Sequence, residues 1–162
     1  MEIGDGATHI GQGAFLLCTS LTSVAIPNSV TSIGEAAFSA CQVLTSITIP
    51  ASVTALDDDV FMGCIALTAI NVEATTPPKI GNTVFYFISD DAKIYVPAGT
   101  EDAYKTKWSV YADMIVSSDT GINNIGSSTS SRQNVNLKRV KNGKLFIETP
   151  NGNFTVAGAR SE

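Results

Sequence analysis

The chain has 162 residues, of which 44% are hydrophobic and 15% are charged, and its formal net charge is −5 at pH 7. This length suits one domain, or one domain with a small appendage, and the apolar fraction is enough for a hydrophobic core. The acidic balance argues against nucleic acid as a partner, no apolar run is long enough to cross a bilayer, and the residues after Met1 lack the basic start and apolar stretch of a secretory signal.

The chain opens inside a repeated unit. The segment MEIGDGATHIGQGAF (1–15) aligns without gaps on VAIPNSVTSIGEAAF (24–38), so that Ile10 falls on Ile33. A stacked-repeat protein is expected to open on a polar cap, because its first coil otherwise exposes apolar edges. We therefore expect further repeats upstream of Met1, and with them a secretion signal that this chain lacks.

A period of 23 residues runs through the first half of the chain. Phenylalanine, cysteine and leucine all recur at this spacing: Phe15, Phe38 and Phe61; Cys18, Cys41 and Cys64; Leu21, Leu44 and Leu67. A short fixed period that several residue types share indicates stacked repeats, in which each unit buries its apolar face against its neighbours. The phenylalanines are predicted to fill the interior of the coils.

Each unit contains a segment in which apolar and other residues alternate, which is the period of a β-strand. These segments are Ser23–Pro27, Ser46–Pro50, Ala69–Glu73 and Lys93–Pro97. We predict that they stack as a parallel sheet with the valine and isoleucine side chains pointing inward. Proline lacks a backbone donor, so the prolines should end the strands.

A second, shorter extended piece is predicted at Ser29–Ile33 and at Ser52–Leu56. After it, Gly34–Cys41 and Asp57–Cys64 should form either one turn of helix or a tight loop. The last unit is degenerate, because Phe85 follows Phe61 by 24 residues instead of 23.

The segment 99–116 predicts an amphipathic helix that caps the stack. Thr100 is placed to cap its N-terminus. Four large apolar residues recur at helical spacing: Tyr104, Trp108, Tyr111 and Ile115. This stripe could hold a ligand or cover the end of the core, and we favour the cap.

The rest of the chain does not follow the repeat. Residues 117–133 hold six serines and no periodicity, which predicts a linker. Residues 134–162 carry a net charge of +3 against −8 for residues 1–116. Within them, Asn142-Gly143 lies between apolar runs and predicts a hairpin. This tail should be a small separate β-rich unit.

The segment AFSACQVLTSITIPASVT (37–54) resembles the BspA-like leucine-rich repeats of bacterial surface proteins. The match rests on Ala-Phe, then Cys, then Leu-Thr-x-Ile-x-Ile-Pro-x-Ser-Val, and extends over about residues 1–97. The tail is more loosely similar to the C-terminal sorting tails of secreted Bacteroidetes proteins. The resemblance implies a right-handed leucine-rich-repeat solenoid that lies outside the cell or on its surface. The partial first copy and the Asp57–Asp59 run depart from the pattern.

The cysteines fit a buried ladder better than a disulfide or zinc site, since their number is odd and their spacing matches no Cys-x-x-Cys motif. His9 is the only histidine, and its repeat position should be exposed. Asp57–Asp59 could be a weak calcium site or the acidic start of a short helix, which also serves as a solvated turn, and we favour the second. We therefore predict no catalytic residue, no cofactor and no metal.

The outward positions of the alternating segments are the candidate partner-binding residues. They are Ser23, Ala25, Ser46, Thr48, Ala69, Asn71, Lys93 and Tyr95. Small polar residues would leave a flat open face that a partner could cover, and Tyr95 is of a type favoured in interfaces. Alternatively, small outward residues merely permit stacking.

Two functions remain open. The first is a non-catalytic surface or secreted module that binds host extracellular, matrix or cell-surface proteins. The second is a structural spacer, or a module that self-associates through its uncapped N-terminal end. An enzyme is disfavoured because the sequence has no glycine-rich phosphate loop, no histidine pair and no nucleophile elbow.

Overall fold

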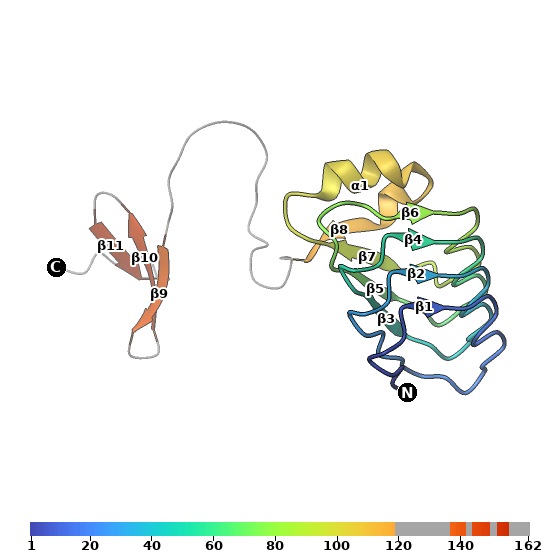
Figure 1. Ribbon diagram of the computed structural model, residues 1–162. Helices are drawn as coiled ribbons and strands as arrows, with labels where there is room; N and C mark the ends of the chain where they lie inside the picture. Colours follow the sequence, from blue (N-terminus) through green and yellow to red (C-terminus); the bar gives the residue numbers. More distant parts are fainter. Residues whose placement is uncertain (119–136, 142–143, 150–151, 156–162) are drawn as a thin grey trace. The chain divides into compact units, whose positions relative to one another are not determined.

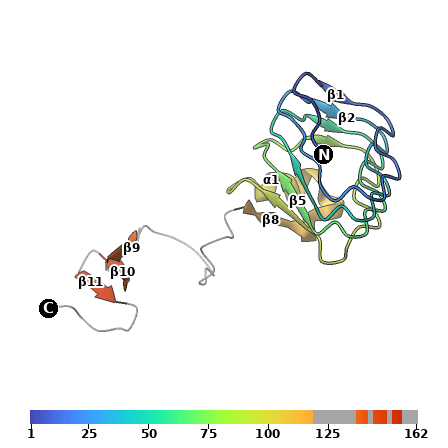
Figure 2. The same cartoon turned by 90° about the horizontal axis from the view of Figure 1, so that it is seen from below.

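Figure 1 shows the computed structural model of the chain, which describes residues 1–118, 137–141, 144–149 and 152–155. The chain divides into two compact units, Met1–Asn124 and Ile125–Glu162. In the first unit, successive coils of the chain lie one above the other, as the view along the stack also shows (Figure 2). The predicted linker 117–133 lies outside the described residues except for Ser117 and Ser118.

One face of the stack is a parallel sheet in the order β3-β5-β7-β8. The strands are β3 (Ser46–Ile49), β5 (Ala69–Val72), β7 (Lys93–Val96) and β8 (Ile115–Ser117). The alternation of the sequence is seen directly, because Ile47, Ile70 and Ile94 share one register position and are buried. The prolines at 50 and 97 follow the last strand residues, as predicted.

The prediction of a full strand at Ser23–Pro27 is wrong. This segment forms one isolated parallel bridge, between Ala25 and Glu2. Its neighbour toward the start of the stack is the short segment Met1–Ile3, and the ladder between them spans a single residue pair. The inward positions are nevertheless correct, since Val24 and Ile26 belong to the core.

A second parallel sheet has the order β1-β2-β4-β6. Its two-residue strands are β1 (His9–Ile10), β2 (Ser32–Ile33), β4 (Ala55–Leu56) and β6 (Lys79–Ile80). They are shorter than the predicted extended pieces. Threonines before two of them strengthen the stack, because the Thr31 hydroxyl donates to the Thr8 carbonyl at 3.1 Å and the Thr54 hydroxyl donates to the Thr31 carbonyl at 3.2 Å.

The segment after each short strand is a tight loop, not a turn of helix. In one coil the backbone N–H groups of Ala36, Phe38 and Ala40 donate to carbonyls of the next coil at 2.7–2.9 Å. These donors are therefore not available for helical bonds within their own coil. Ala36 and Ala40 adopt positive φ angles of 52° and 57°, which turn the chain between those bonds.

The phenylalanine column is the centre of the core. Phe38 and Phe61 have no exposed surface, and their ring centroids lie 5.5 Å apart at an interplanar angle of 5°. Phe15 and Phe85 extend the stacked column on either side, with centroid distances of 5.1 Å to Phe38 and 5.7 Å to Phe61. The prediction that these side chains fill the coil interior is confirmed.

The helix predicted for 99–116 is shorter than expected. Helix α1 covers Glu101–Lys107, the 3-10 helix η1 covers Ser109–Met114, and Ile115 begins strand β8. Thr100 does not cap α1 with its side chain; its hydroxyl donates instead to the Pro97 carbonyl at 2.7 Å.

The buried stripe of this segment is confirmed as part of the core. Tyr104, Trp108, Tyr111 and Ile115 are all buried. The Tyr104 hydroxyl donates to the Ala74 carbonyl at 2.6 Å, and the Trp108 ring contacts that of Phe85 with centroids 6.1 Å apart. Helix α1 and η1 thus pack onto the last coil of the stack (Figure 1).

The cysteine ladder is confirmed for Cys41 and Cys64, which are buried, whereas Cys18 is partly exposed. The two buried thiols also make hydrogen bonds: Cys41 Sγ donates to the Phe15 carbonyl at 3.3 Å and Cys64 Sγ to the Phe38 carbonyl at 3.1 Å. Burial raises the pKa of Cys41 and raises that of Cys64 to about 12.

Thiol labelling at pH 8 should therefore separate the three cysteines. Because thiol reagents attack the thiolate, we expect Cys18 to react quickly and Cys64 to react only after unfolding in denaturant. With a pKa of about 12, only about one Cys64 side chain in ten thousand is ionised at pH 8. A Cys18→Ser variant is the control and should lose the fast phase. Equally fast labelling of all three thiols without denaturant would contradict the packing.

Gly81 offers a second test of the stacking. A Cβ atom at Gly81 would lie 2.5 Å from the backbone nitrogen of Asp58 and 2.7 Å from the backbone carbonyl carbon of Asp57, in the preceding coil. We expect Gly81→Ala to lower the free energy of unfolding by about 1–3 kcal/mol, because backbone must move. Gly11 holds the same repeat position with nothing within 4 Å, so Gly11→Ala is the matched control. Equal melting temperatures for the two variants would refute the close approach.

The second unit contains an antiparallel sheet in the order β11-β10-β9. Its strands are β9 (Leu137–Lys141), β10 (Lys144–Thr149) and β11 (Gly152–Thr155). All three strands lie within the segment 134–162 that the sequence predicts to be β-rich. The hairpin residues Asn142 and Gly143 lie outside the described residues.

Candidate functional site

The outward side of the β3-β5-β7 sheet brings most of the predicted binding residues together. Their strand registers place them in two rows across the sheet. One row is Ser46, Ala69 and Lys93, and the other is Thr48, Asn71 and Tyr95. Strand β8 continues the second row with Val116, next to Tyr95. The residues form a surface because each strand pairs in parallel with the next without a shift in register.

This sheet face is open and contains few large side chains. Ser46, Thr48 and Lys93 are exposed, whereas Ala69, Asn71 and Tyr95 are half-buried. Lys93 carries the only formal charge in the two rows, and Tyr95 has the only aromatic ring. The arrangement can offer hydroxyl and amide groups, one cation and one ring to a partner over a broad area, and it does not converge on a single point as a catalytic site would.

Ser23 and Ala25 lie in the coil before β3 and are both exposed. They lie outside the four-stranded sheet, because their segment forms only the bridge to Glu2. The structure therefore places six of the eight predicted residues on the β3-β5-β7 face and two on the neighbouring coil.

The acidic run Asp57–Asp59 is held by the following coil. Asp58 Oδ1 accepts a hydrogen bond of 2.7 Å from the Asn82 backbone N–H, and Asp59 Oδ1 accepts one from the Thr83 hydroxyl. These residues do not start a helix; they lie in a turn, as the solvated-turn alternative predicts, and Asp59 has a φ of 59°. Within the described part of the chain, no group of three or more His, Cys, Asp or Glu side chains is arranged to hold a metal ion.

His9 is exposed, as its repeat position predicts, and its Nδ1 lies 2.7 Å from the Ser32 hydroxyl oxygen. Each of the two atoms can serve as the donor, depending on the histidine tautomer. The contact joins β1 to β2 across the register pair His9 and Ser32.

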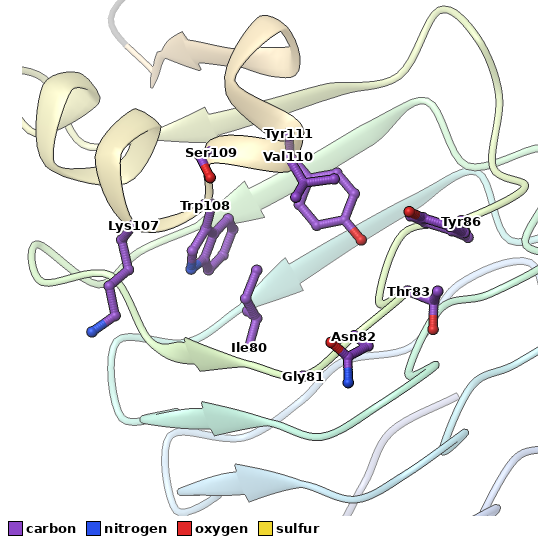
Figure 3. A pocket seen from close by; sticks show the side chains of 10 residues that line it. All are labelled: Ile80, Gly81, Asn82, Thr83, Tyr86, Lys107, Trp108, Ser109, Val110 and Tyr111. Atoms are coloured by element: carbon purple, nitrogen blue, oxygen red, sulfur yellow. The ribbon is translucent and has the colours of Figure 1, made fainter.

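A pocket that the sequence did not indicate lies between the last coil and η1 (Figure 3). Its volume is about 450 Å³, and its lining comes from Ile80–Thr83 and Tyr86 on one side and from Lys107–Tyr111 on the other. About 25 residues separate the two sides in sequence. One feature of the sequence could have pointed to this pocket. The loop position that is Ser39 in an earlier coil is Tyr86 in the last coil, and Tyr86 is exposed.

Comparison with known proteins agrees with this architecture. Residues 8–126 match the BspA type leucine rich repeat region, in six copies. The crystal structure of a leucine-rich repeat protein from Bacteroides ovatus ATCC 8483 is similar over 63% of this chain, with 31% sequence identity and a TM-score of 0.51. The chain spans about a quarter of that protein, since the match covers 26% of its length. No curated protein matches the chain.

Among the residues that the structure describes, no helix is both long and apolar enough to cross a membrane. The repeat match covers well over half of the sequence, and the coils, the parallel strands and the phenylalanine column are what such repeats require. The chain belongs to the BspA-type leucine-rich-repeat family.

Proposed function

We propose that the chain is a non-catalytic adhesion module of a secreted or cell-surface protein, and that it binds a protein partner through the outward face of β3, β5 and β7. The observation that carries this proposal is the flat face itself, in which two rows of small residues lead to Lys93 and Tyr95 in β7. A repeat stack offers an extended surface of this kind to partners. Host extracellular or matrix proteins are the proposed class of partner.

The residues of this face suit recognition better than a purely structural role. Tyrosine supplies a large contact area at low conformational cost, and interfaces are enriched in it. Tyr95 is half-buried, and the exposed Lys93 lies two residues before it in the same strand. An acidic protein region is thus the fitting counterpart at this end of the face, whereas Ser46 and Thr48 leave the other end flat.

The test is binding of the purified chain to a panel of extracellular-matrix proteins, with the variant Lys93→Ala/Tyr95→Ala beside the unchanged chain. We expect the double substitution to weaken binding at least tenfold, or about 1.4 kcal/mol. The matched control is Lys105→Ala/Phe87→Ala, which also removes one lysine and one exposed aromatic ring, but away from this face. Equal losses in the two variants, or no binding to any member of the panel, would refute the proposal and favour a structural spacer.

A further inference from the structure

The pocket between the last coil and η1 has a chemistry different from that of the sheet face. It is a concave site of about 450 Å³ in which both polar and aromatic side chains converge, as Figure 3 shows. Ligand pockets typically pair apolar and aromatic walls with a few fixed polar groups. Each kind of group is present here.

The Asn82 side chain on the pocket wall is held in place and can still accept a further hydrogen bond. Asp58 Oδ1 accepts from the Asn82 backbone N–H at 2.7 Å and from Asn82 Nδ2 at 3.5 Å. The Asn82 side-chain nitrogen therefore faces Asp58, and its carbonyl oxygen is left on the pocket side, where it can accept a hydrogen bond (Figure 3).

Tyr111 supplies the complementary donor. It is only 6% exposed, and its hydroxyl oxygen accepts from the Phe85 backbone N–H at 3.3 Å, a bond that leaves its own proton free to be donated. Burial raises the pKa of Tyr111, so this proton is retained at neutral pH. In Figure 3 its hydroxyl points toward that of Tyr86 across the pocket.

The apolar part of the pocket is open to solvent. The Tyr86 side chain is 42% exposed and the Val110 side chain is 74% exposed, although both are large apolar groups. Trp108, which is 1% exposed, lies behind them and donates its indole N–H to the Pro78 carbonyl at 3.0 Å. The open ring of Tyr86 is therefore the flat apolar surface that a ligand can cover.

The charges around the pocket are of both signs and do not select an ionic ligand of either sign. Asp58 and Asp59 lie directly behind Asn82 and Thr83, to which they are hydrogen-bonded, and their carboxylates repel phosphate and carboxylate groups. Lys107 lies at the opposite end of the lining, where it repels cations and attracts anions, so the two ends of the pocket favour opposite charges. A neutral ligand that has both hydroxyl groups and an apolar face is repelled by neither end.

We propose that this pocket binds a neutral saccharide. The apolar C–H face of a sugar ring covers the Tyr86 ring, one sugar hydroxyl donates to the Asn82 carbonyl oxygen, and another sugar oxygen accepts from Tyr111. The site is separate from the protein-binding face proposed above, because it is formed by the last coil and η1 and not by the outward rows of β3, β5 and β7.

The chain carries its own reporter for the test, since Trp108 is its only tryptophan and lines the pocket. The full chain would be titrated with maltose, lactose and N,N′-diacetylchitobiose while tryptophan fluorescence is recorded, and saturation-transfer NMR would show contact independently. We expect at least one of the three to bind with a Kd of about 1 mM or tighter. The absence of both signals for all three sugars would overturn the proposal.

Two variants locate the binding. Tyr86→Ala removes the exposed ring, and Tyr111→Phe removes one hydroxyl while keeping the ring; each is expected to weaken binding at least tenfold. The control is Ile65→Ala, which is 60% exposed and lies outside the lining. Unchanged affinity in both pocket variants would overturn the proposal, as would tighter binding of glucose 6-phosphate than of the neutral sugars.

A protein-linked glycan presents the same sugar ring as a free saccharide. A second arm of the experiment therefore measures capture of a glycoprotein before and after enzymatic removal of its N-linked chains. Capture that is lost both on deglycosylation and in Tyr86→Ala supports the pocket with a conjugated glycan as its ligand. Sugar binding without such capture supports the pocket with a free saccharide as its ligand.

Discussion

Replacing Phe38 by alanine is expected to lower the free energy of unfolding by about 3–5 kcal/mol, because it removes a fully buried ring and leaves a cavity. The Phe38 ring has no exposed surface and lies between the rings of Phe15 and Phe61, with centroids at 5.1 and 5.5 Å. Two ring contacts are therefore lost together. The measurement is chemical denaturation followed by circular dichroism.

Phe87→Ala is the matched control for this substitution. It removes the same side chain from the same unit, but from a position that is 75% exposed, so its effect should stay within about 0.5 kcal/mol. A Phe38→Ala variant no less stable than Phe87→Ala would show that the column is not the core of the stack.

Trp108→Ala should cost about as much, roughly 3–5 kcal/mol, because a large buried side chain and a buried hydrogen bond are lost. The indole N–H donates to the Pro78 carbonyl at 3.0 Å, and the ring contacts Tyr104 edge-on with centroids 5.0 Å apart. Without it, α1 and η1 lose one of their attachments to the last coil. Circular dichroism is the appropriate probe, since the substitution removes the only tryptophan.

Two further variants define the origin of this loss. Trp108→Phe keeps an aromatic ring but leaves the Pro78 carbonyl without its donor, so an intermediate loss is expected. Val110→Ala changes a residue of η1 that is 74% exposed and should be nearly neutral. If the alanine and phenylalanine variants were equally destabilised, the hydrogen bond and not the packing of the ring would dominate.

The repeated parts of the fold could be read from the sequence because each signal occurs several times. Alternation in Ser46–Pro50 would be weak evidence alone, but the same alternation at Ala69–Glu73 and Lys93–Pro97 fixes both the strand and its inward face. The phenylalanine spacing likewise predicts a column, and the structure shows stacked rings from Phe15 to Phe85.

The helix predicted over 99–116 came out too long because its segment occurs once and carries an ambiguous signal. Ile115 follows Tyr111 by four residues, which fits a helix, yet its backbone pairs with Ile94 as the start of β8. A three-residue strand is too short to show a period of two. The tertiary ladder beside β7 decides the outcome, and no local pattern reports it.

The loop conformation was predicted only as one of two alternatives because alanine gives no turn signal. Ala40 has a φ of 57°, a region that alanine disfavours. The informative residue is its repeat equivalent Gly63, which has a φ of 75°. Reading the four coils as one column would therefore have favoured the tight loop over a turn of helix.

The candidate sites likewise include one that the sequence predicted and one that it did not. The outward rows of the sheet follow from strand alternation, so their placement was accessible to sequence reasoning. The pocket brings Asn82 and Tyr86 together with Tyr111, and that contact depends on how η1 packs onto the last coil. Side chains that meet through packing of a single unrepeated segment leave no periodic trace in the sequence.

The regular register between coils has a mechanical consequence. In the β1-β2-β4-β6 sheet, each coil is joined to its neighbours by the same kind of parallel ladder, with partners such as Ser32 and Ala55 one repeat apart. Load applied between the first coil and the last would therefore strain similar ladders one after another. Such a stack is expected to lengthen under tension in uniform steps, each of which releases one coil and about 80 Å of extended chain.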